Sequence, residues 1–392
     1  MARWIKLHRN GVKIMLRIER IDQEVYMKFI REHPYHNFLQ YPSWADLKGK
    51  WKWSSEIIAW LNTQRTIVGA TIILYRKVPG LNKYLAYIPR GPLIDWFGDY
   101  KLEDWFFPLF HRLKEQKVFT VKMDPPLVVR KWTAQNLIDS IHNFKAHGLK
   151  NKRLIDIQPD YVSNEVEYIQ QELAAMGWKR TMFEDSFDTV QPQFVYRLNL
   201  KGKTLEQIFS QFDPLWQERI YLAEHNDVKI ELGTERHLPE FHQLMKEQAK
   251  REKTQVRDLQ YFVDMFESLT FEDPHRIKLY MARKDQELLS AALAIRVPGH
   301  TWDIYGVKKS DHYDDPASYL LRWKMIQDAV EMGDEIFDFR GISINLDTED
   351  PIYELLQFKC GFGGEACELM GEWDYPVIPM LHWAFEMYMK KR

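Results

Sequence analysis

Hydrophobic residues along the chain follow strand and helix periodicities that succeed one another in the same order in both halves. In the first half, three strand patterns precede an amphipathic helix and a further strand, at residues 56–61, 66–75, 84–89, 100–115 and 118–123. In the second half, the same order is found at residues 277–283, 288–297, 301–307, 317–332 and 336–342. Each half is therefore predicted to form an α/β unit with its own sheet.

The order strand, strand, strand, helix, strand is that of an N-acetyltransferase-like α/β unit. We therefore predict an α/β (α+β) fold of two tandem N-acetyltransferase-like (GNAT) domains with a cleft between them. The boundary is placed near residue 200, where a strand ends and a fresh helix begins. The first domain is expected to comprise residues 1–200 plus 371–392, and the second residues 201–370. No sustained heptad repeat is present, so no coiled-coil arm is expected.

Composition places the chain among globular proteins. Of its 392 residues, 45% are hydrophobic and 28% are charged, which excludes a disordered chain. No apolar run approaches the ~18 residues that cross a bilayer, and no signal-peptide core is present, so we expect a cytoplasmic protein. The net charge of −2 means that an anionic partner must be bound by local basic patches. Cys360 and Cys367 suit neither a zinc site nor a disulfide framework and are interpreted as buried thiols, with Cys360 as a nucleophile the alternative.

Two segments combine basic residues with apolar or aromatic ones. Residues 1–20 carry six Lys and Arg residues against one acid, and include a strand pattern at 12–18. Residues 127–164 carry basic residues interleaved with Trp132 and Phe144. The charges of both segments are explained by solvated faces, which for the second means a surface helical insertion. The alternatives are contact with tRNA or anionic lipid for the first segment, and with a tRNA acceptor stem for the second.

A lysine near the C-terminus is placed at a glycine-rich turn. The strand at 336–342 leads through acidic residues and Pro351 to a helix at 352–359, which puts Lys359 in the last turn. The glycines that follow are expected to end this helix in the left-handed conformation. Lys359 there complements the helix dipole. Alternatively, it holds a positive charge where a reaction develops negative charge.

Several motifs resemble those of one family. The C-terminal ones are Phe337-Asp338-Phe339-Arg340-Gly341, Gln357-Phe358-Lys359-Cys360-Gly361-Phe362-Gly363 and Gly371-Glu372-Trp373-Asp374. Further matches are the spacing of Gln40, Trp44 and Lys48, the Pro-Arg-Gly-Pro turn at 89–92 and the Gln-Pro pair at 191–192. Together they resemble the FemABX family of tRNA-dependent aminoacyltransferases, which build peptide branches on bacterial cell-wall precursors. The resemblance covers residues 37–126 and 191–376.

The resemblance implies that three residues are catalytic. Lys359, with Phe358 beside it, is expected to supply positive charge for the oxyanion of the tetrahedral intermediate. Asp124, which follows a strand and precedes a proline, is expected to orient or deprotonate the acceptor amine. From the pattern alone, such an aspartate caps a turn.

The resemblance also implies three substrate-binding residues and neither a metal nor a cofactor. Lys48, on a helix that Ser43 is expected to cap, and Arg257 match residues that bind the phosphates of the precursor. Tyr305 matches a tyrosine that faces the cleft. From the pattern alone, Lys48 is a solvated helix charge and Tyr305 is an aromatic residue of a strand.

The implied function is the transfer of an amino acid from aminoacyl-tRNA to the side-chain amine of the stem peptide of a peptidoglycan precursor, either UDP-MurNAc-pentapeptide or lipid II. The missing arm indicates the compact, first-residue-adding type, which we expect to be a monomer with peripheral contact to the inner face of the cell membrane. Two alternatives remain. A coenzyme A-dependent N-acyltransferase would need a Gln/Arg-x-x-Gly-x-Gly/Ala loop, and none is found. A non-catalytic RNA-binding or membrane-binding protein would use the basic segments.

Overall fold

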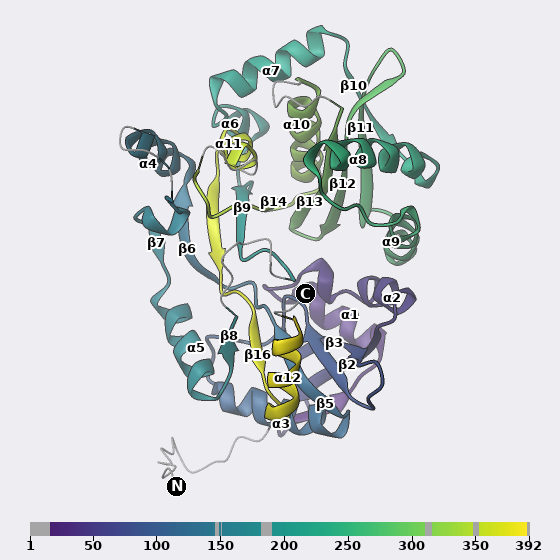
Figure 1. Cartoon of the computed structure of the whole chain (residues 1–392), viewed down its shortest axis with the longest axis vertical. Helices are drawn as coiled ribbons and strands as arrows, with labels where there is room; N and C mark the ends of the chain where they lie inside the picture. The colour runs from purple at the N-terminus through teal and green to yellow at the C-terminus, as the bar shows by residue number, and fades with distance from the viewer. Residues whose placement is uncertain are drawn as a thin grey trace.

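The computed structural model contains two mixed β-sheets with helices packed on them (Figure 1). It describes residues 16–145, 149, 151–181, 190–309, 316–347 and 353–389. The first sheet has the strand order β1-β2-β3-β4-β5-β16-β8. Its strands are β1 (Arg17–Arg20), β2 (Ser54–Leu61), β3 (Ile67–Lys77), β4 (Tyr84–Ile88), β5 (Val118–Met123), β16 (Trp373–Tyr375) and β8 (Lys179–Arg180).

The second sheet has the strand order β10-β11-β12-β13-β14-β9-β15-β6-β7. Its strands are β10 (Lys229–Gly233), β11 (Ile277–Lys284), β12 (Glu287–Val297), β13 (His300–Lys308), β14 (Ile336–Gly341), β9 (Phe194–Asn199), β15 (Glu365–Leu369), β6 (Val128–Thr133) and β7 (Tyr161–Val162).

Helices connect these strands and cover the sheets. They are α1 (Gln23–Glu32), α2 (Pro42–Lys50), α3 (Leu102–Glu115), α4 (Ala134–Lys145), α5 (Asn164–Ala175), α6 (Leu205–Phe209), α7 (Pro214–His225), α8 (Leu238–Glu252), α9 (Leu259–Glu272), α10 (Pro316–Glu331), α11 (Tyr353–Cys360) and α12 (Pro379–Met389), with short 3₁₀ turns η1 (Phe38–Gln40), η2 (Leu154–Asp156) and η3 (Glu235–His237). Among the helices in the described ranges, α10 is the longest with 16 residues, and none forms a coiled-coil arm.

Each sheet contains the repeated order that the hydrophobic pattern predicts. In the first, β2, β3 and β4 pair antiparallel, and α3 then leads to β5, which lies parallel to β4. In the second, β11, β12 and β13 pair antiparallel, and α10 leads to β14, which lies parallel to β13. A parallel neighbour requires a crossover, which the helix provides. The predicted mixed α/β fold with two such units is therefore confirmed.

Sheet membership does not follow the predicted boundary near residue 200. Strands β6, β7 and β9 precede that residue but lie in the second sheet. Strand β16 returns to the first sheet, pairing with β5 and β8. The chain therefore crosses between the sheets several times, so a division into residues 1–200 plus 371–392 and residues 201–370 stays a prediction about domains.

A shared hydrophobic core joins the two sheet units through α2 and α9. Buried Leu47 of α2 and Phe262 of α9 belong to one cluster, and the two helices pack against each other. At the start of α2, the backbone N–H and the hydroxyl of Ser43 both donate to the Glu272 carboxylate, at 3.0 and 2.8 Å. The helix begins at Pro42, with Tyr41 as N-cap residue, so the prediction that Ser43 caps it is wrong. The Glu272 carboxylate from α9 supplies the acceptor that a cap would otherwise provide.

The segment 127–164 is not a surface helical insertion as a whole. Its first part is β6, paired with β15 on one side and β7 on the other. Trp132 is fully buried there and its indole N–H donates to the Ile157 carbonyl at 2.9 Å. Val129 and Trp132 lie on opposite faces of β6 and pack in two different hydrophobic clusters, so the strand is buried on both faces.

Candidate active site at the junction of the two sheets

Lys359 is buried and lies in the last turn of α11, with 6% of its surface exposed. Its ammonium donates to the carbonyl of Gly341, at the end of β14, at 2.6 Å. Burial lowers the pKa of Lys359 to about 8, against the opposing charges of Asp303 and Asp338. An ammonium ion is costly to bury without partners, so a role limited to complementing the helix dipole does not account for its position.

Two ion pairs surround this lysine. Arg322 of α10 donates to the Asp303 carboxylate at 3.0 Å, and Arg197 of β9 donates to the Asp338 carboxylate at 3.0 Å. Burial would raise the pKa of Asp338, but the His300 ring, 3.6 Å away, and the charge of Arg197 hold the pKa well below its usual range. The lysine therefore sits in a fixed field of carboxylates and guanidinium groups, which is the kind of preorganised environment that stabilises developing charge.

The strands β13 and β14 separate beside this cluster. Their parallel pairing is limited to His300–Trp302 against Ile336–Asp338, although both strands continue further. Asp303 and Tyr305 follow on β13, and Arg340 follows on β14 with a left-handed φ of 65°. Where parallel strands part, their side chains and backbone groups are available to a ligand instead of to each other.

The glycines after Lys359 differ from the expectation. Gly363 and Gly364 have positive φ, at 72° and 88°, whereas Gly361 does not. A side chain at Gly361 would overlap the ring of Trp216 from α7, whose indole N–H donates to the Phe358 carbonyl at 2.9 Å. Gly361 is thus required by close packing of a tryptophan and not by left-handed backbone.

Phe358, the residue before Lys359, packs in the hydrophobic core. Its ring meets those of Tyr319 and Phe362 edge-on, at 5.1 and 5.3 Å between centroids. The Arg322 guanidinium lies 5.8 Å from the same ring. The side chain therefore packs in the core that supports α11, close to the ion pairs described above.

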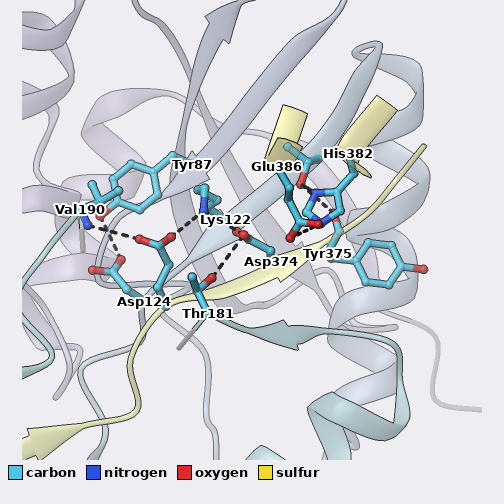
Figure 2. Close-up of polar contacts among 11 residues, drawn as sticks. Tyr87, Lys122, Asp124, Thr181, Val190, Asp374, Tyr375, His382 and Glu386 are labelled. Atoms are coloured by element: carbon cyan, nitrogen blue, oxygen red, sulfur yellow. Dashed lines mark hydrogen bonds and ion pairs between the residues drawn. The ribbon is translucent and has the colours of Figure 1, made fainter. Parts of the chain in front are cut away.

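Asp124 lies at the end of β5, in the first sheet, and is also buried (Figure 2). One carboxylate oxygen accepts hydrogen bonds from the Tyr87 hydroxyl at 3.1 Å and from the Arg90 backbone N–H at 2.8 Å. The other oxygen is 3.6 Å from the Arg90 guanidinium and has no hydrogen-bond partner among the described residues. Burial raises the pKa of Asp124 to about 6, although Arg90 opposes the shift.

An ionic network continues from Asp124 into the first sheet. Lys122 pairs with Glu372 at 2.5 Å and with Asp374 at 2.8 Å. Figure 2 shows that Thr181 donates to the Asp374 carboxylate and the Val190 backbone N–H to the Glu372 carboxylate. Burial would lower the pKa of Lys122, but the two carboxylates outweigh it and raise the pKa. The Gly371–Asp374 motif therefore supports the strand that presents Asp124 through charge pairs inside the fold.

Arg340 connects the two buried groups. Its guanidinium donates to the Gln191 side chain at 3.0 Å, and Arg90 donates to the neighbouring Pro192 carbonyl at 2.7 Å. The pKa of Arg340 is lowered by burial and by the charge of Arg90, and the pKa of Lys359 responds to Arg340 in turn. Lys359 and Asp124 thus belong to one cluster of charges, although they come from different sheets.

The three predicted substrate-binding residues also come together. The Lys48 ammonium is 3.4 Å from the Tyr261 hydroxyl, and the Arg257 guanidinium lies 4.7 Å from the same ring. Burial lowers the pKa of Lys48 to about 8, and the charges of Arg257 and Arg76 add to the shift. Burial raises the pKa of Tyr261, and the neighbouring Tyr305 adds to the shift. An open pocket of about 470 Å³ lies here, lined by Trp51, Tyr261 and residues 255–258.

Tyr305 lies between the two groups of charges. It is close enough to Tyr261 and to Arg340 to affect the pKa of each. Pairwise effects on the pKa link Lys48 to Arg257, Arg257 to Tyr261, Tyr261 to Tyr305, Tyr305 to Arg340, and Arg340 to both Lys359 and Arg90. Residues that are far apart in the sequence form one continuous, mainly cationic band at the junction of the sheets.

Sequence reasoning missed Arg90, Arg340 and Tyr261 as site residues. Arg90 and Arg340 both lie in quoted motifs, beside a glycine and at the end of a strand. Arg90 is buried and Arg340 half-buried, and both have positive φ, at 49° and 65°. Exposed basic residues such as Arg65 also have positive φ, so Arg90 and Arg340 are distinguished by left-handed backbone together with their burial. That conformation could not be read from the sequence.

The basic segment and the cysteines have other roles. Arg130 and Arg180 both pair with the buried Glu368, and Lys131 pairs with Glu365 at 2.6 Å. The two basic residues of β6 are thus paired with acidic residues of the neighbouring strand β15. Residues 1–15, which hold most of the other basic segment, lie outside the described part.

Both thiols are free and buried, and burial raises the pKa of each to about 12. That shift disfavours the thiolate a nucleophile needs. Within the ranges that the structure describes, no group of three or more His, Cys, Asp or Glu side chains is arranged to hold a metal ion. In the same ranges, no helix has both the length and the apolar character needed to cross a bilayer.

Fold and site together define an α/β protein with two sheet units and a buried cationic centre where they meet. The FemAB family model matches residues 21–283 and 275–391. The chain belongs to the FemAB family, and the resemblance seen in the motifs is confirmed.

Relatives and a solved structure agree with this membership. The chain is 26% identical over 407 residues to the Lipid II:glycine glycyltransferase of Staphylococcus saprophyticus subsp. saprophyticus, with 93% of this chain and 94% of the relative covered. It is 23% identical over 428 residues to the protein of the same name from Staphylococcus haemolyticus, with the same coverage. The crystal structure of FemX has a TM-score of 0.77 at 19% identity, covering 94% of this chain and 100% of that one. The shared fold therefore extends over nearly the whole chain.

Proposed function

We propose that this protein transfers an amino acid from aminoacyl-tRNA to the side-chain amine of the stem peptide of a peptidoglycan precursor. The observation that carries the proposal is the buried Lys359 ammonium, held at the junction of the sheets among two ion pairs. The relatives named Lipid II:glycine glycyltransferase support the reaction class and a lipid-linked acceptor.

In the proposed reaction, the neutral amine attacks the ester carbonyl of the aminoacyl-tRNA. A new C–N bond forms, the carbonyl oxygen becomes an oxyanion, and collapse of the tetrahedral intermediate breaks the ester and releases the ribose hydroxyl. Lys359, with a pKa of about 8, is mostly protonated at neutral pH and stabilises the oxyanion, a contribution of about 3 kcal/mol. Holding both substrates in one site supplies much of the remaining rate.

The amine must lose protons, and two routes are available. Asp124, with a pKa of about 6, is mainly a carboxylate at neutral pH and has one oxygen without a hydrogen-bond partner among the described residues. It can orient the amine or accept its proton. The other route is the 3′-terminal ribose of the tRNA, which can shuttle the proton to the departing oxygen.

The precursor diphosphate is proposed to bind beside Tyr261. Lys48 offers a compact ammonium and Arg257 a planar guanidinium that can hold phosphate in a bidentate manner. Tyr305 then lies between the diphosphate and the reacting groups. Because the phosphates are common to both precursors, this pocket accepts the nucleotide-linked and the lipid-linked form, and the relatives' name favours the latter. We expect the enzyme to act as a monomer in the cytoplasm, where aminoacyl-tRNA is available.

Replacing Lys359 by methionine tests the proposal. Turnover with charged tRNA and a precursor should fall by about 10²–10³-fold, because one preorganised charge for the oxyanion is lost. Precursor affinity should change little. Lys246→Met, at an exposed lysine of α8, is the matched control and should leave both quantities unchanged. A folded Lys359→Met protein with turnover within threefold of the parent would exclude the assigned role.

A further inference from the structure

One carboxylate oxygen in the charge cluster around Lys359 is left without a hydrogen bond. The side chain of Asp303 is 9% exposed, and its Oδ2 accepts from the Arg322 Nε at 3.0 Å. Its Oδ1 is buried and has no hydrogen-bond partner in the part of the chain that the structure describes. A buried carboxylate oxygen loses its hydration, and this loss is costly unless a donor replaces the water. The Oδ1 atom is therefore a free acceptor inside the site.

The other buried aspartates of the second sheet unit differ from Asp303 in this respect. Asp328 of α10 accepts from the Tyr280 hydroxyl at 2.9 Å on one oxygen and pairs with Lys324 at 2.8 Å on the other. Both oxygens are likewise hydrogen-bonded in two further buried aspartates, Asp334 and Asp338. The free oxygen is thus a particular property of Asp303 and not a general feature of carboxylates in this part of the fold.

Asp303 lies at the point where β13 and β14 separate. It is the first residue of β13 beyond the segment that pairs with β14, and the register against β12 shifts between Asp303 and Tyr305. Irregularities of this kind re-aim side chains and are frequent next to functional sites. Lys359 is held to the end of β14 through the Gly341 carbonyl. The carboxylate on β13 and the ammonium at the end of β14 therefore lie at the same fork between the strands.

Arg322 fixes the orientation of the Asp303 carboxylate. Its guanidinium lies against Gly306 of β13, where any side chain would overlap it. The guanidinium is also 5.8 Å from the ring of Phe358, and only 8% of Arg322 is exposed. Because these contacts hold the guanidinium in place, its hydrogen bond to Oδ2 also determines where Oδ1 lies. The free oxygen is therefore preorganised for a ligand.

The donor of the proposed reaction carries a group that matches this oxygen. In an aminoacyl ester, the carbon next to the carbonyl bears an α-ammonium group, which has a positive charge and three N–H donors. The Lys359 ammonium also has three donors, and Gly341 accepts from one of them. The ester carbonyl oxygen can accept from Lys359 in the same way. Its α-ammonium then lies within the immediate surroundings of Lys359, to which Asp303 belongs.

We propose that Oδ1 of Asp303 binds the α-ammonium of the amino acid carried by the tRNA and thereby places the ester carbonyl at Lys359. The inference rests on the proposed function and deepens it, because it defines the donor as an ester with a free α-amine. Esters of N-acylated amino acids and of 2-hydroxy acids lack this charge and leave Oδ1 unpaired, so the site discriminates against them. Asp303 thus serves the donor, whereas Asp124 is assigned to the acceptor amine.

Two donors that differ in a single group test the assignment. RNA acceptor-stem helices esterified with glycine or with glycolic acid present the same carbonyl beside an α-ammonium or an α-hydroxyl. The kcat/KM of the parent should be about 10–100-fold higher for the glycyl donor. In Asp303→Asn, Arg322 keeps the amide oxygen and the NH₂ group faces the α-ammonium. This variant should therefore lower the ratio of the two kcat/KM values by about tenfold or more. An equal loss on both donors would assign Asp303 to proton transfer or to structure and overturn the proposal.

Asp328→Asn is the matched control. It also removes a buried carboxylate, but one whose oxygens are both paired inside the protein, so the ratio should stay that of the parent. If Asp303→Asn does not fold because Arg322 loses its charge partner, Asp303→Ala/Arg322→Met removes both members of the pair. The double variant is read by the same ratio, which does not depend on overall activity. A parent-like ratio in either folded variant of Asp303 contradicts the proposal.

Binding of donors that cannot react separates this inference from the proposed function. The same helices with glycine or glycolic acid joined to the 3′ end through an amide serve as probes. The parent should bind the glycyl helix about tenfold more tightly, and Asp303→Asn should bind both alike. Selective binding through Asp303 without transfer to any acceptor would refute the proposed function and leave this inference standing. Transfer without preference between the two esters would do the reverse, and binding of neither helix would contradict both.

Discussion

At the scale of single residues, burial has moved two ionisable groups toward neutral pH. The pKa of Lys359 is lowered to about 8 and that of Asp124 is raised to about 6, in both cases chiefly because the charged form loses its hydration. Neither group is left without compensation, since Asp303 and Asp338 oppose the shift at the lysine and Arg90 opposes it at the aspartate. Both are therefore mostly charged between pH 6 and 8, the state that the proposed reaction requires.

The rate of transfer should depend on pH accordingly. Below pH 6, Asp124 takes up a proton, so a carboxylate that orients or deprotonates the amine is lost and the rate falls. Above pH 8, Lys359 loses its proton, so the rate should stop rising even though more of the acceptor amine becomes neutral. Single-turnover rates measured from pH 5 to 9 with saturating substrates check both limbs.

Asp124→Asn tests whether Asp124 causes the expected fall of the transfer rate below pH 6. If it abolishes turnover and leaves precursor binding intact, Asp124 is the group that handles the proton, and the ribose route is wrong. If turnover survives and the limb near pH 6 remains, the ribose carries the proton and the limb belongs to another group. A parent profile without any break near pH 8 would contradict the role of Lys359.

At the scale of elements, α11 is placed by its neighbours more than by its own sequence. Trp216 of α7 packs against Gly361 and donates to the Phe358 carbonyl, and Gly341 at the end of β14 accepts from Lys359. Helix α11 is thereby held by contacts at Phe358 and Gly361, which flank Lys359 in the sequence, and at Lys359 itself. Its orientation depends on the absence of a side chain at Gly361.

Gly361→Ala should therefore disturb the site without touching a charged group. The new methyl group would overlap the Trp216 ring, and relieving such overpacking costs about 1–3 kcal/mol of the free energy of unfolding. Turnover should fall because α11 shifts. Urea denaturation and single-turnover kinetics measure the two effects.

Gly49→Ala is a matched control, since nothing lies within 4 Å of a side chain there. In a helix this change should leave stability equal or raise it by up to ~1 kcal/mol. Full stability and turnover in Gly361→Ala would show that α7 and α11 do not constrain each other.

At the scale of the whole molecule, the two sheet units share a core instead of meeting at a wet interface. Leu47 of α2 is fully buried in a cluster that includes residues of α8, α9 and β11 to β13. Trp51 donates to Asp264 at 3.0 Å and Ser43 to Glu272, so polar contacts reinforce the same contact between helices. The pocket at Arg257 lies at this contact, which keeps Lys48 and Tyr261 in register.

Leu47→Ala should accordingly destabilise both sheets together. A cavity in this shared core should lower the free energy of unfolding by about 2–5 kcal/mol. Hydrogen exchange should show lost protection in β2 to β4 and in β11 to β13 alike. Leu215→Ala, at a 43% exposed leucine of α7, is the control. Two separate unfolding transitions, with only one of them shifted, would contradict a single cooperative unit.

The local pattern of hydrophobic and polar residues was enough to predict the strands of the two parallel pairs, β4–β5 and β13–β14, and the helices that connect them. Strand β5 and helix α9 begin where hydrophobic period and turn residues place them. The same reasoning failed for β6, because Val128, Val129 and Trp132 do not alternate with the basic residues between them and so give no strand signal. Its identity as a strand depends on β15, which comes more than 200 residues later and supplies the pairing acids Glu365 and Glu368.

For the site, the sequence by itself determined which residue types stand in the motifs, and the resemblance of those motifs to the FemABX family made Lys359, Asp124, Lys48, Arg257 and Tyr305 the candidates. Tertiary structure alone decided that they lie in one band and that Arg90, Arg340 and Tyr261 connect them. The reason is that burial, left-handed backbone at two arginines and charge–charge proximity arise only when distant segments pack together. No local periodicity encodes how close Arg340 comes to Arg90, whereas the field at Lys359 depends on it.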